Sequence, residues 1–161
     1  MDLFGKAKSV RLMSYNDRYL TADGDQQTVT HTSHRESSST IWTVEMMEDE
    51  NDFIRLKSCH GTYLTASSSP FLPGVTGKKV IQTEMESSSY CDPAPKWQPL
   101  RDGMQVRLRS FCGNYLRPNG GLPPWRGSVT HDVPHRPKTR DKLLWDVEVV
   151  EKSADNKQTT D

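Results

Sequence analysis

The stretch of the chain with the most side chains suited to recognition is NGGLPPWRGSVTHDVPHRP, residues 119–137. It brings one tryptophan together with basic and titratable side chains, namely Trp125, Arg126, His131, His135 and Arg136. Indole rings stack on flat ligand faces, and arginine and histidine bind polar or anionic groups. We therefore take these five residues as candidates for a binding surface. The alternative, that Trp125 and the neighbouring prolines cover an open end of the fold, stays open, and Phe71 in SSSPFLP is expected to cover it in a similar way.

The histidines do not predict a metal centre. His131 and His135 are four residues apart, and His31 and His34 are three apart, which are spacings that metal ligands can have. His31 and His131, however, occupy the same place in two copies of a repeated segment, where Gln82 stands in the third copy. A position shared by repeats favours a structural role, and no cysteine pair has zinc-ligand spacing. We expect neither a metal nor a cofactor.

Catalytic motifs are missing from the sequence. It has no nucleophile elbow, no phosphate-binding glycine loop and no H-E-x-x-H segment. Cys59 shares its hairpin position with Tyr15 and Phe111, so we expect a buried apolar residue there. Cys112 falls in a tight turn without an activating partner nearby in sequence. The sequence therefore predicts a protein that is not an enzyme.

The charge balance argues against nucleic acid and membrane partners. The 161 residues include 21 Lys plus Arg and 21 Asp plus Glu, so the formal net charge is zero. No apolar run reaches the length of a membrane span, and the opening MDLFGKAKSV lacks the apolar core of a secretory signal. Three cysteines are an odd count, which speaks against a disulfide framework. We expect reduced thiols and a cytoplasmic or nuclear location.

The candidate residues must be positioned by a unit that occurs three times. Its copies share an aliphatic residue, Arg, Leu, any residue, Ser, a short turn and then Tyr-Leu. They read VRLMSYNDRYLTAD at Val10–Asp23, IRLKSCHGTYLTAS at Ile54–Ser67 and VRLRSFCGNYLRPN at Val106–Asn119. The alternation of apolar and polar residues around turn residues predicts a β-hairpin in each copy.

The length of the hairpin loop decides which residues face inward. A two-residue turn would point Leu12 and Leu20 to opposite faces, whereas a three-residue loop at 15–17 places them opposite each other and both inward. The last residue of a three-residue loop favours glycine, and Gly61 and Gly113 stand at that place in the other copies. We therefore predict the three-residue loop.

Two more landmarks follow each hairpin, a valine and a tryptophan. Each repeat then holds four short strand candidates, and no stretch has sustained helical periodicity. The sequence predicts an all-β fold, a β-trefoil with pseudo-threefold symmetry, in which a six-strand barrel is closed at one end by three hairpins. The predicted core consists of five triplets: Val10, Ile54 and Val106; Leu12, Leu56 and Leu108; Leu20, Leu64 and Leu116; Val29, Val80 and Val129; Trp42, Trp97 and Trp145.

The repeats also predict surface pairs. Arginine recurs at one outward position as Arg11, Arg55 and Arg107. It could form a threefold ligand or filament surface, but charge pairing across strands is the more common use of such a position. Since the first and fourth strands of a trefoil repeat are neighbours, we predict the pairs Arg11–Glu45 and Arg107–Glu148.

The ends of the repeats set the domain limits. Pro99 stands where the other copies have valine, so we expect the fourth strand of the second repeat to be short or to lie at an irregular edge. We place one trefoil domain at residues 1–151 and a polar, disordered tail at 152–161.

Taken together, these residues resemble a family of plant proteins of uncharacterised function that are classed with fascin-like, actin-cross-linking β-trefoils. The resemblance runs from about Met1 to Glu151 and is most specific in NGGLPPWRGSVTHDVPH, in LLWDVEVVE and in the opening MDLFGKAKSVRLMSYNDRYLTAD. It implies a trefoil fold, no enzymatic activity and a role in binding or cross-linking filamentous actin. Fascin-type bundlers join several trefoils and this chain has one, so cross-linking would need two filament sites on one domain or a dimer.

Two functions from different classes follow. The first is a non-catalytic intracellular module that binds a protein such as actin. The second is a carbohydrate- or small-ligand-binding trefoil that uses Trp125 for stacking. Against the second, the Gln-x-Trp signature of ricin-type trefoils is missing, because Thr40, Pro95 and Leu143 stand two residues before the repeated tryptophans. An enzyme or an inhibitor ranks last.

Overall fold

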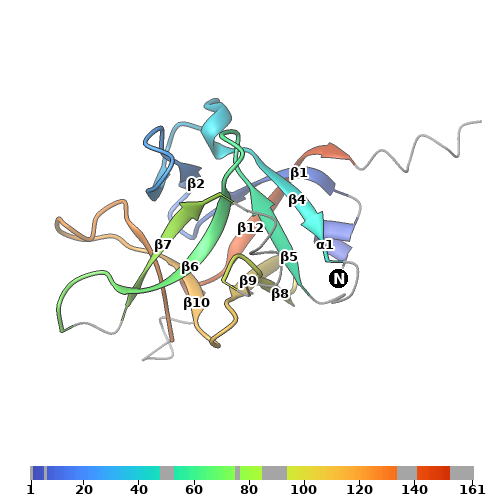
Figure 1. Ribbon diagram of the computed structural model, residues 1–161. Helices are drawn as coiled ribbons and strands as arrows, with labels where there is room; N and C mark the ends of the chain where they lie inside the picture. Colours follow the sequence, from blue (N-terminus) through green and yellow to red (C-terminus); the bar gives the residue numbers. More distant parts are fainter. Residues whose placement is uncertain are drawn as a thin grey trace, which may run out of the picture.

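The computed structural model describes residues 2–5, 7–47, 53–74, 77–84, 94–133 and 141–152, and within them the chain forms one twelve-stranded antiparallel sheet. Figure 1 shows these strands with a short N-terminal helix at one side. The elements are α1 (Asp2–Gly5), β1 (Ala7–Met13), β2 (Tyr19–Ala22), β3 (Val29–Thr32), η1 (Ser38–Thr40), β4 (Trp42–Met46), β5 (Ile54–Lys57), β6 (Tyr63–Pro70), β7 (Lys78–Thr83), β8 (Gln98–Asp102), β9 (Gln105–Arg109), β10 (Tyr115–Pro118), β11 (Val129–Asp132) and β12 (Trp145–Lys152).

The strands are arranged as a β-trefoil, as predicted. The first and fourth strands of the repeats form the barrel, and the pairing of β12 with β1 joins the end of the chain to its beginning. The second and third strands form three hairpins, β2–β3, β6–β7 and β10–β11. The hairpin strands extend to the side of the molecule opposite α1 (Figure 1). The third strands meet each other, since β11 pairs with β7 and Thr28 bridges to Ile81.

The three-residue hairpin loop is confirmed in the first copy. Ser14 N donates to Arg18 O at 2.7 Å, and Asp17 N donates to Ser14 O at 3.1 Å, which leaves residues 15–17 as the loop. Asp17 has a φ of 62°, in the left-handed region, where Gly61 and Gly113 have φ of 84° and 89°. The serine hydroxyl of the motif accepts a backbone N–H from across each loop.

The predicted core is also confirmed. All fifteen residues of the five triplets are at most 3% exposed. In each repeat the indole N–H of the buried tryptophan donates to the carbonyl of the leucine on the second strand. The three bonds are Trp42 to Leu20 at 3.0 Å, Trp97 to Leu64 at 2.9 Å and Trp145 to Leu116 at 3.3 Å. Each bond ties a hairpin to the barrel and satisfies a polar group that burial would otherwise leave unpaired.

The predicted arginine pairs were wrong in their partners. The long ladder of β1 is with β12, where Arg11 lies opposite Glu148 and forms an ion pair at 3.1 Å. Glu45 lies opposite Arg55 on β5. Within the described residues, β1 pairs with β4 only at Ser9 and Val10, the two residues before Arg11. Each arginine therefore lies opposite the fourth strand of the preceding repeat and not that of its own repeat. Arg107 instead pairs with Asp102 at 3.1 Å.

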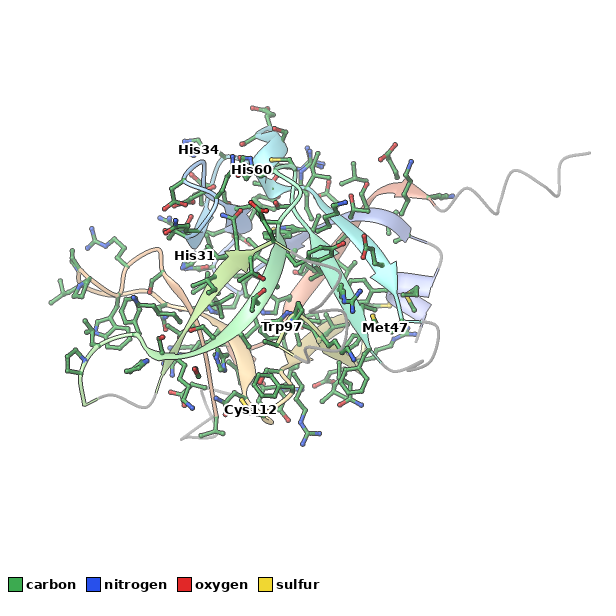
Figure 2. The ribbon with its side chains drawn as sticks, viewed as in Figure 1. His31, His34, Met47, His60, Trp97 and Cys112 are labelled. Atoms are coloured by element: carbon green, nitrogen blue, oxygen red, sulfur yellow. The ribbon has the colours of Figure 1, made fainter. Side chains whose placement is uncertain are left out.

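The prediction that Cys59 is buried was also wrong. Cys59 is exposed because it is the first residue of the hairpin loop, where Tyr15 and Phe111 are 43% and 47% exposed. The loop directs this position to solvent, although the residue types are apolar. Cys112 is exposed as well and lies below Trp97 in the view of Figure 2.

The fourth strands of the second and third repeats, β8 and β12, lie where those repeats end. Within the described residues, β8 has a ladder with β9 and touches β5 only through the bridge between Trp97 and Ile54, so the strand that contains Pro99 lies at an edge as predicted. β12 ends at Lys152, one residue past the predicted domain boundary, and the rest of the predicted tail lies outside the described residues. No helix in the described part of the chain is long and apolar enough to cross a membrane.

Candidate functional site

A ring of three buried side chains links the hairpins to one another. The third strands carry His31, Gln82 and His131 opposite the core leucines, and these side chains are 1–4% exposed. Each reaches a backbone carbonyl at the equivalent place of a neighbouring repeat. The contacts are His31 Nε2 to Asn119 O (2.7 Å), Gln82 Nε2 to Asp23 O (3.1 Å) and His131 Nε2 to Ser67 O (2.7 Å). Figure 2 shows His31 inside the hairpin side of the molecule.

These contacts fix the state of both histidines. A carbonyl oxygen only accepts, so Nε2 of His31 and of His131 must carry a proton, and in the neutral ring Nδ1 is then an acceptor. Asn114 Nδ2 lies 3.1 Å from His131 Nδ1 and donates to it. Nδ1 of His31 has no partner among the described residues, and Arg18 is the cation that acts on it. Burial lowers the pKa of both imidazoles below their usual 6.5, which favours the neutral form.

The outer face of the hairpins is where the third repeat departs from the other two. In the first repeat Thr21 and Thr32 lie diagonally across the β2–β3 ladder with their hydroxyl oxygens 3.2 Å apart. Thr65 and Thr83 repeat this contact on β6–β7 at 2.7 Å. The same two places on β10–β11 are held by a cation and a carboxylate, Arg117 and Asp132. Of the three hairpins, the third therefore has charged side chains at the two places where the other two have hydrogen-bonded threonines.

The loop between β10 and β11 is held in place by Asn119. Its backbone N donates to Ser128 O and its carbonyl accepts from Gly127 N. Its side-chain amide donates to the hydroxyls of Ser128 and Thr130 at 3.1 and 3.0 Å. Both amide hydrogens are thus used within the protein, and Oδ1 remains an acceptor. Ser128 also bonds to Trp125 O, so the same residues fix the base of the loop and the backbone of Trp125.

A cavity of about 410 Å³ lies under this loop. Several chain segments build it, and its lining side chains include Tyr15, Arg117, Asn119, Trp125, Asp132 and Lys142. Two glycines also line it: a Cβ at Gly77 would lie 3.6 Å from Asp132 Oδ2, and a Cβ at Gly120 would lie 3.7 Å from the Tyr15 hydroxyl, both ordinary contact distances. The residues that line the cavity therefore include an indole, an amide, one carboxylate and two cations.

Trp125 also fulfils the covering role that the sequence left open. Its ring packs on Phe71, with the centroids 4.7 Å apart and the planes tilted by 37°. Phe71 lines a second cavity of about 290 Å³, where Val29, Val80 and Val129 of the three third strands meet. The aromatic pair thus covers the hairpin end of the barrel through Phe71 and borders the polar cavity through Trp125.

The five candidate residues from the sequence are not gathered in one place. Trp125 lines the polar cavity. Arg126 is exposed and donates to Gly121 O at 2.9 Å, within its own loop. His131 is 1% exposed and belongs to the buried ring. His135 and Arg136 lie outside the described residues. Of the five, Trp125 is the one that the structure brings to the cavity.

Sequence reasoning missed most of the lining residues. Strand alternation is the signal that would have found some of them, because a buried His131 places Thr130 and Asp132 on the opposite face of β11. The same alternation puts Arg117 and Asn119 on one face around β10. Tyr15 and Lys142 carry no such signal, since only tertiary packing brings them to this loop.

Within the described residues there is no group of three or more His, Cys, Asp or Glu side chains that could hold a metal ion.

Comparisons with solved structures show the fold. The chain resembles the designed three-fold symmetric protein ThreeFoil with a TM-score of 0.71 and 14% identity over 89% of this chain and 99% of that chain. It resembles the cytolethal distending toxin of Haemophilus ducreyi with a TM-score of 0.66 and 16% identity over 91% and 87%.

A third similar structure is the GlcNAcα1-4Gal-releasing endo-β-galactosidase of Clostridium perfringens. The TM-score is 0.63 and the identity 13%, over 89% of this chain and 32% of the enzyme. A search of curated proteins gave no significant match. The profile of one family matches residues 1–145, which is most of the chain and ends where β12 begins. The chain therefore belongs to the family described as the beta-trefoil domain of unknown function (DUF569).

Proposed function

We propose that this protein is a non-catalytic binding module that takes a carbohydrate in the cavity of the third repeat. The observation that supports this most is the combination of Trp125 with Asn119 and Asp132 around one cavity of about 410 Å³. That volume is within the usual range for small-ligand sites. An indole packs on the apolar face of a sugar ring, while carboxylate and amide oxygens accept hydrogen bonds from its hydroxyls.

The rigidity of the site supports the same function. Asn119 and Ser128 hold the loop by bonds within the protein, and His31 fixes the Asn119 carbonyl from the first repeat. Asp132 Oδ1 accepts from the backbone N of Val133 at 2.8 Å, which fixes the orientation of the carboxylate. A site whose polar groups are already in position loses little freedom when a ligand binds.

The cavity favours binding over hydrolysis. Glycoside hydrolysis normally uses a pair of carboxylates on either side of the scissile bond. Asp132 is the one carboxylate among the residues that line the cavity within the described chain. The endo-β-galactosidase from Clostridium perfringens contains a similar trefoil over about a third of its length, so the fold occurs in a protein that acts on a carbohydrate. The cytoplasmic or nuclear location stays a prediction from the sequence.

A glycan array tests the proposal. Wild type is expected to bind a subset of glycans, and Trp125→Ala is expected to lose that binding. Trp125→Phe keeps an aromatic face toward both the cavity and Phe71, so it should retain part of it. Asp132→Asn changes the charge but not the size and should weaken binding without unfolding the chain. An array without any bound glycan for the folded wild type would refute the proposal.

The fascin-like actin role implied by the sequence resemblance is a separate prediction. Co-sedimentation with filamentous actin at low and high salt measures it directly. Pelleting of wild type that is unchanged in Trp125→Ala would show an actin-binding surface away from the cavity and would favour the actin role over the carbohydrate role.

A further inference from the structure

We propose that the ligand of the third-repeat cavity is an acidic sugar, and that Arg117 and Lys142 bind its anionic group. This inference rests on the proposed carbohydrate function and adds the chemical class of the ligand. It comes from the charges around the cavity rather than from Trp125. The anionic group is a carboxylate, as in a uronic acid, or a sulfate ester, both of which present planar or clustered oxygens to guanidinium and ammonium groups.

The first observation is an excess of positive charge at the cavity. Arg117 and Lys142 line it together with one carboxylate, Asp132. Among the described residues neither cation forms an ion pair: the described contact of Lys142 is with the ring of Tyr15, with Nζ 5.6 Å from its centroid. By contrast, Arg11, Arg35 and Arg107 each have an acidic partner. The two cavity cations are therefore available to a ligand.

The second observation is the break in symmetry at Arg117. The equivalent places in the first two repeats are held by Thr21 and Thr65, each of which bonds to a threonine across its hairpin. Threonine suffices for the fold at this place, so the trefoil itself does not require an arginine. Arg117 lies opposite Thr130 in the β10–β11 ladder, on the face that carries Asn119. Its position is that of a specificity-determining residue for a ligand held by Trp125 and Asn119.

The third observation is the position of Lys142. It precedes β12, more than 20 residues after Arg117, and yet lines the same cavity. Its contact with Tyr15 holds the ammonium group near the first repeat's hairpin loop. Arg117 and Lys142 thus approach the cavity from different segments, an arrangement that can grip one anionic group from two sides.

Isothermal titration calorimetry on the full chain tests the inference with four probes. They are a galacturonic acid trisaccharide, the neutral galactose trisaccharide, a sulfated galactose trisaccharide and inorganic sulfate. We expect an anionic trisaccharide to bind at least about tenfold more tightly than the neutral one, with an affinity that falls as salt rises. The carboxylated and sulfated arms identify which anion is preferred. If inorganic sulfate binds as tightly as the anionic trisaccharides, the inference is overturned, because the sugar rings would then contribute nothing to the affinity.

Two variants make the test specific. Arg117→Thr installs the residue that the other repeats use, and it should weaken binding of the acidic sugar by at least about tenfold more than binding of the neutral sugar. Lys79→Thr is the control, because Lys79 lines the second, apolar cavity. Equal affinity for acidic and neutral sugars, or an unchanged preference in Arg117→Thr, would overturn the inference and leave the carbohydrate function standing. No binding of any sugar would overturn both.

Discussion

The buried ring of His31, Gln82 and His131 predicts how stability depends on pH. Burial favours the neutral form of both histidines and lowers their pKa below the value of the unfolded chain. The stability that they contribute is therefore fully present above about pH 6.5 and is lost as pH falls below it. Each histidine can add a slope of up to about 1.4 kcal/mol per pH unit in that window. Arg18 near His31 and Lys78 near His131 act in the same direction, while Asp132 opposes it at His131.

Gln82 shows which substitution tests this, because a glutamine makes the same contact between repeats without a titratable group. The double variant His31→Gln and His131→Gln should keep the contacts near pH 7.5, and its stability should change little between pH 7.5 and 5.5. His131→Ala leaves the Ser67 carbonyl without its donor and should cost about 2 kcal/mol near pH 7.5 and less as pH falls toward 5.5, where the wild type loses the contribution of this histidine. For a chain of this length that corresponds to a fall in Tm of roughly 4–8 °C.

Urea unfolding followed by tryptophan fluorescence at half-unit pH steps measures this. Asp25, whose pKa is lowered by its bonds to Thr28, influences stability only below about pH 4 and so does not interfere. Superimposable pH profiles for wild type and the double glutamine variant would refute the assignment of neutral, stability-linked histidines.

Three further predictions concern the scaffold. Gly61→Ala places a side chain at a φ of 84° and should cost about 1–2 kcal/mol in urea unfolding, whereas Gly24→Ala, with open space and no positive φ, should be neutral within about 0.5 kcal/mol. Trp42→Phe removes the donor to Leu20 O and leaves a void, so it should lower the free energy of unfolding by about 2–3 kcal/mol, and an unchanged Tm would contradict this. Arg18→Asn should give His31 Nδ1 the donor that Asn114 gives His131 and raise the Tm by about 2–4 °C, with a lowered Tm as the contrary result.

The fold was predictable because its determinants are local and occur three times. The hairpin loop residues, the paired leucines and the alternation around them specify register without reference to the rest of the chain. Repetition then removed ambiguity, since a reading that buried Leu12 also had to bury Leu56 and Leu108. The tryptophan bonds to backbone carbonyls, by contrast, became visible only in the structure.

The errors arose where a choice between neighbouring strands had to be made. Sequence alone shows that Arg11 points outward, but two fourth strands flank β1, and only the register shows that Glu148 rather than Glu45 is its partner. Cys59 was placed by residue type, while the direction of the hairpin loop decides its exposure.

The loop that holds the candidate site could be predicted from the sequence, but most of the residues that line the cavity could not. The third-repeat loop stands out because its sequence departs from the repeat, and Trp125 does line the cavity. Residue type favoured the histidines, yet His131 lies on the inner face of β11 and its neighbour Asp132 on the outer one. Tyr15 and Lys142 come from distant segments and could not be assigned before the packing was known.

The most direct test of the carbohydrate site is a titration of isotope-labelled protein with the galacturonic acid trisaccharide, followed by NMR. We predict the largest shifts at the Trp125 indole N–H, the Asn119 side-chain amide and the backbone amides of Gly120 and Gly121, with the Trp42 indole unchanged. Trp125→Ala should abolish these shifts. Shifts that cluster instead around the equivalent threonines of the first two repeats, or no shifts at millimolar sugar, would contradict a ligand site in the third repeat.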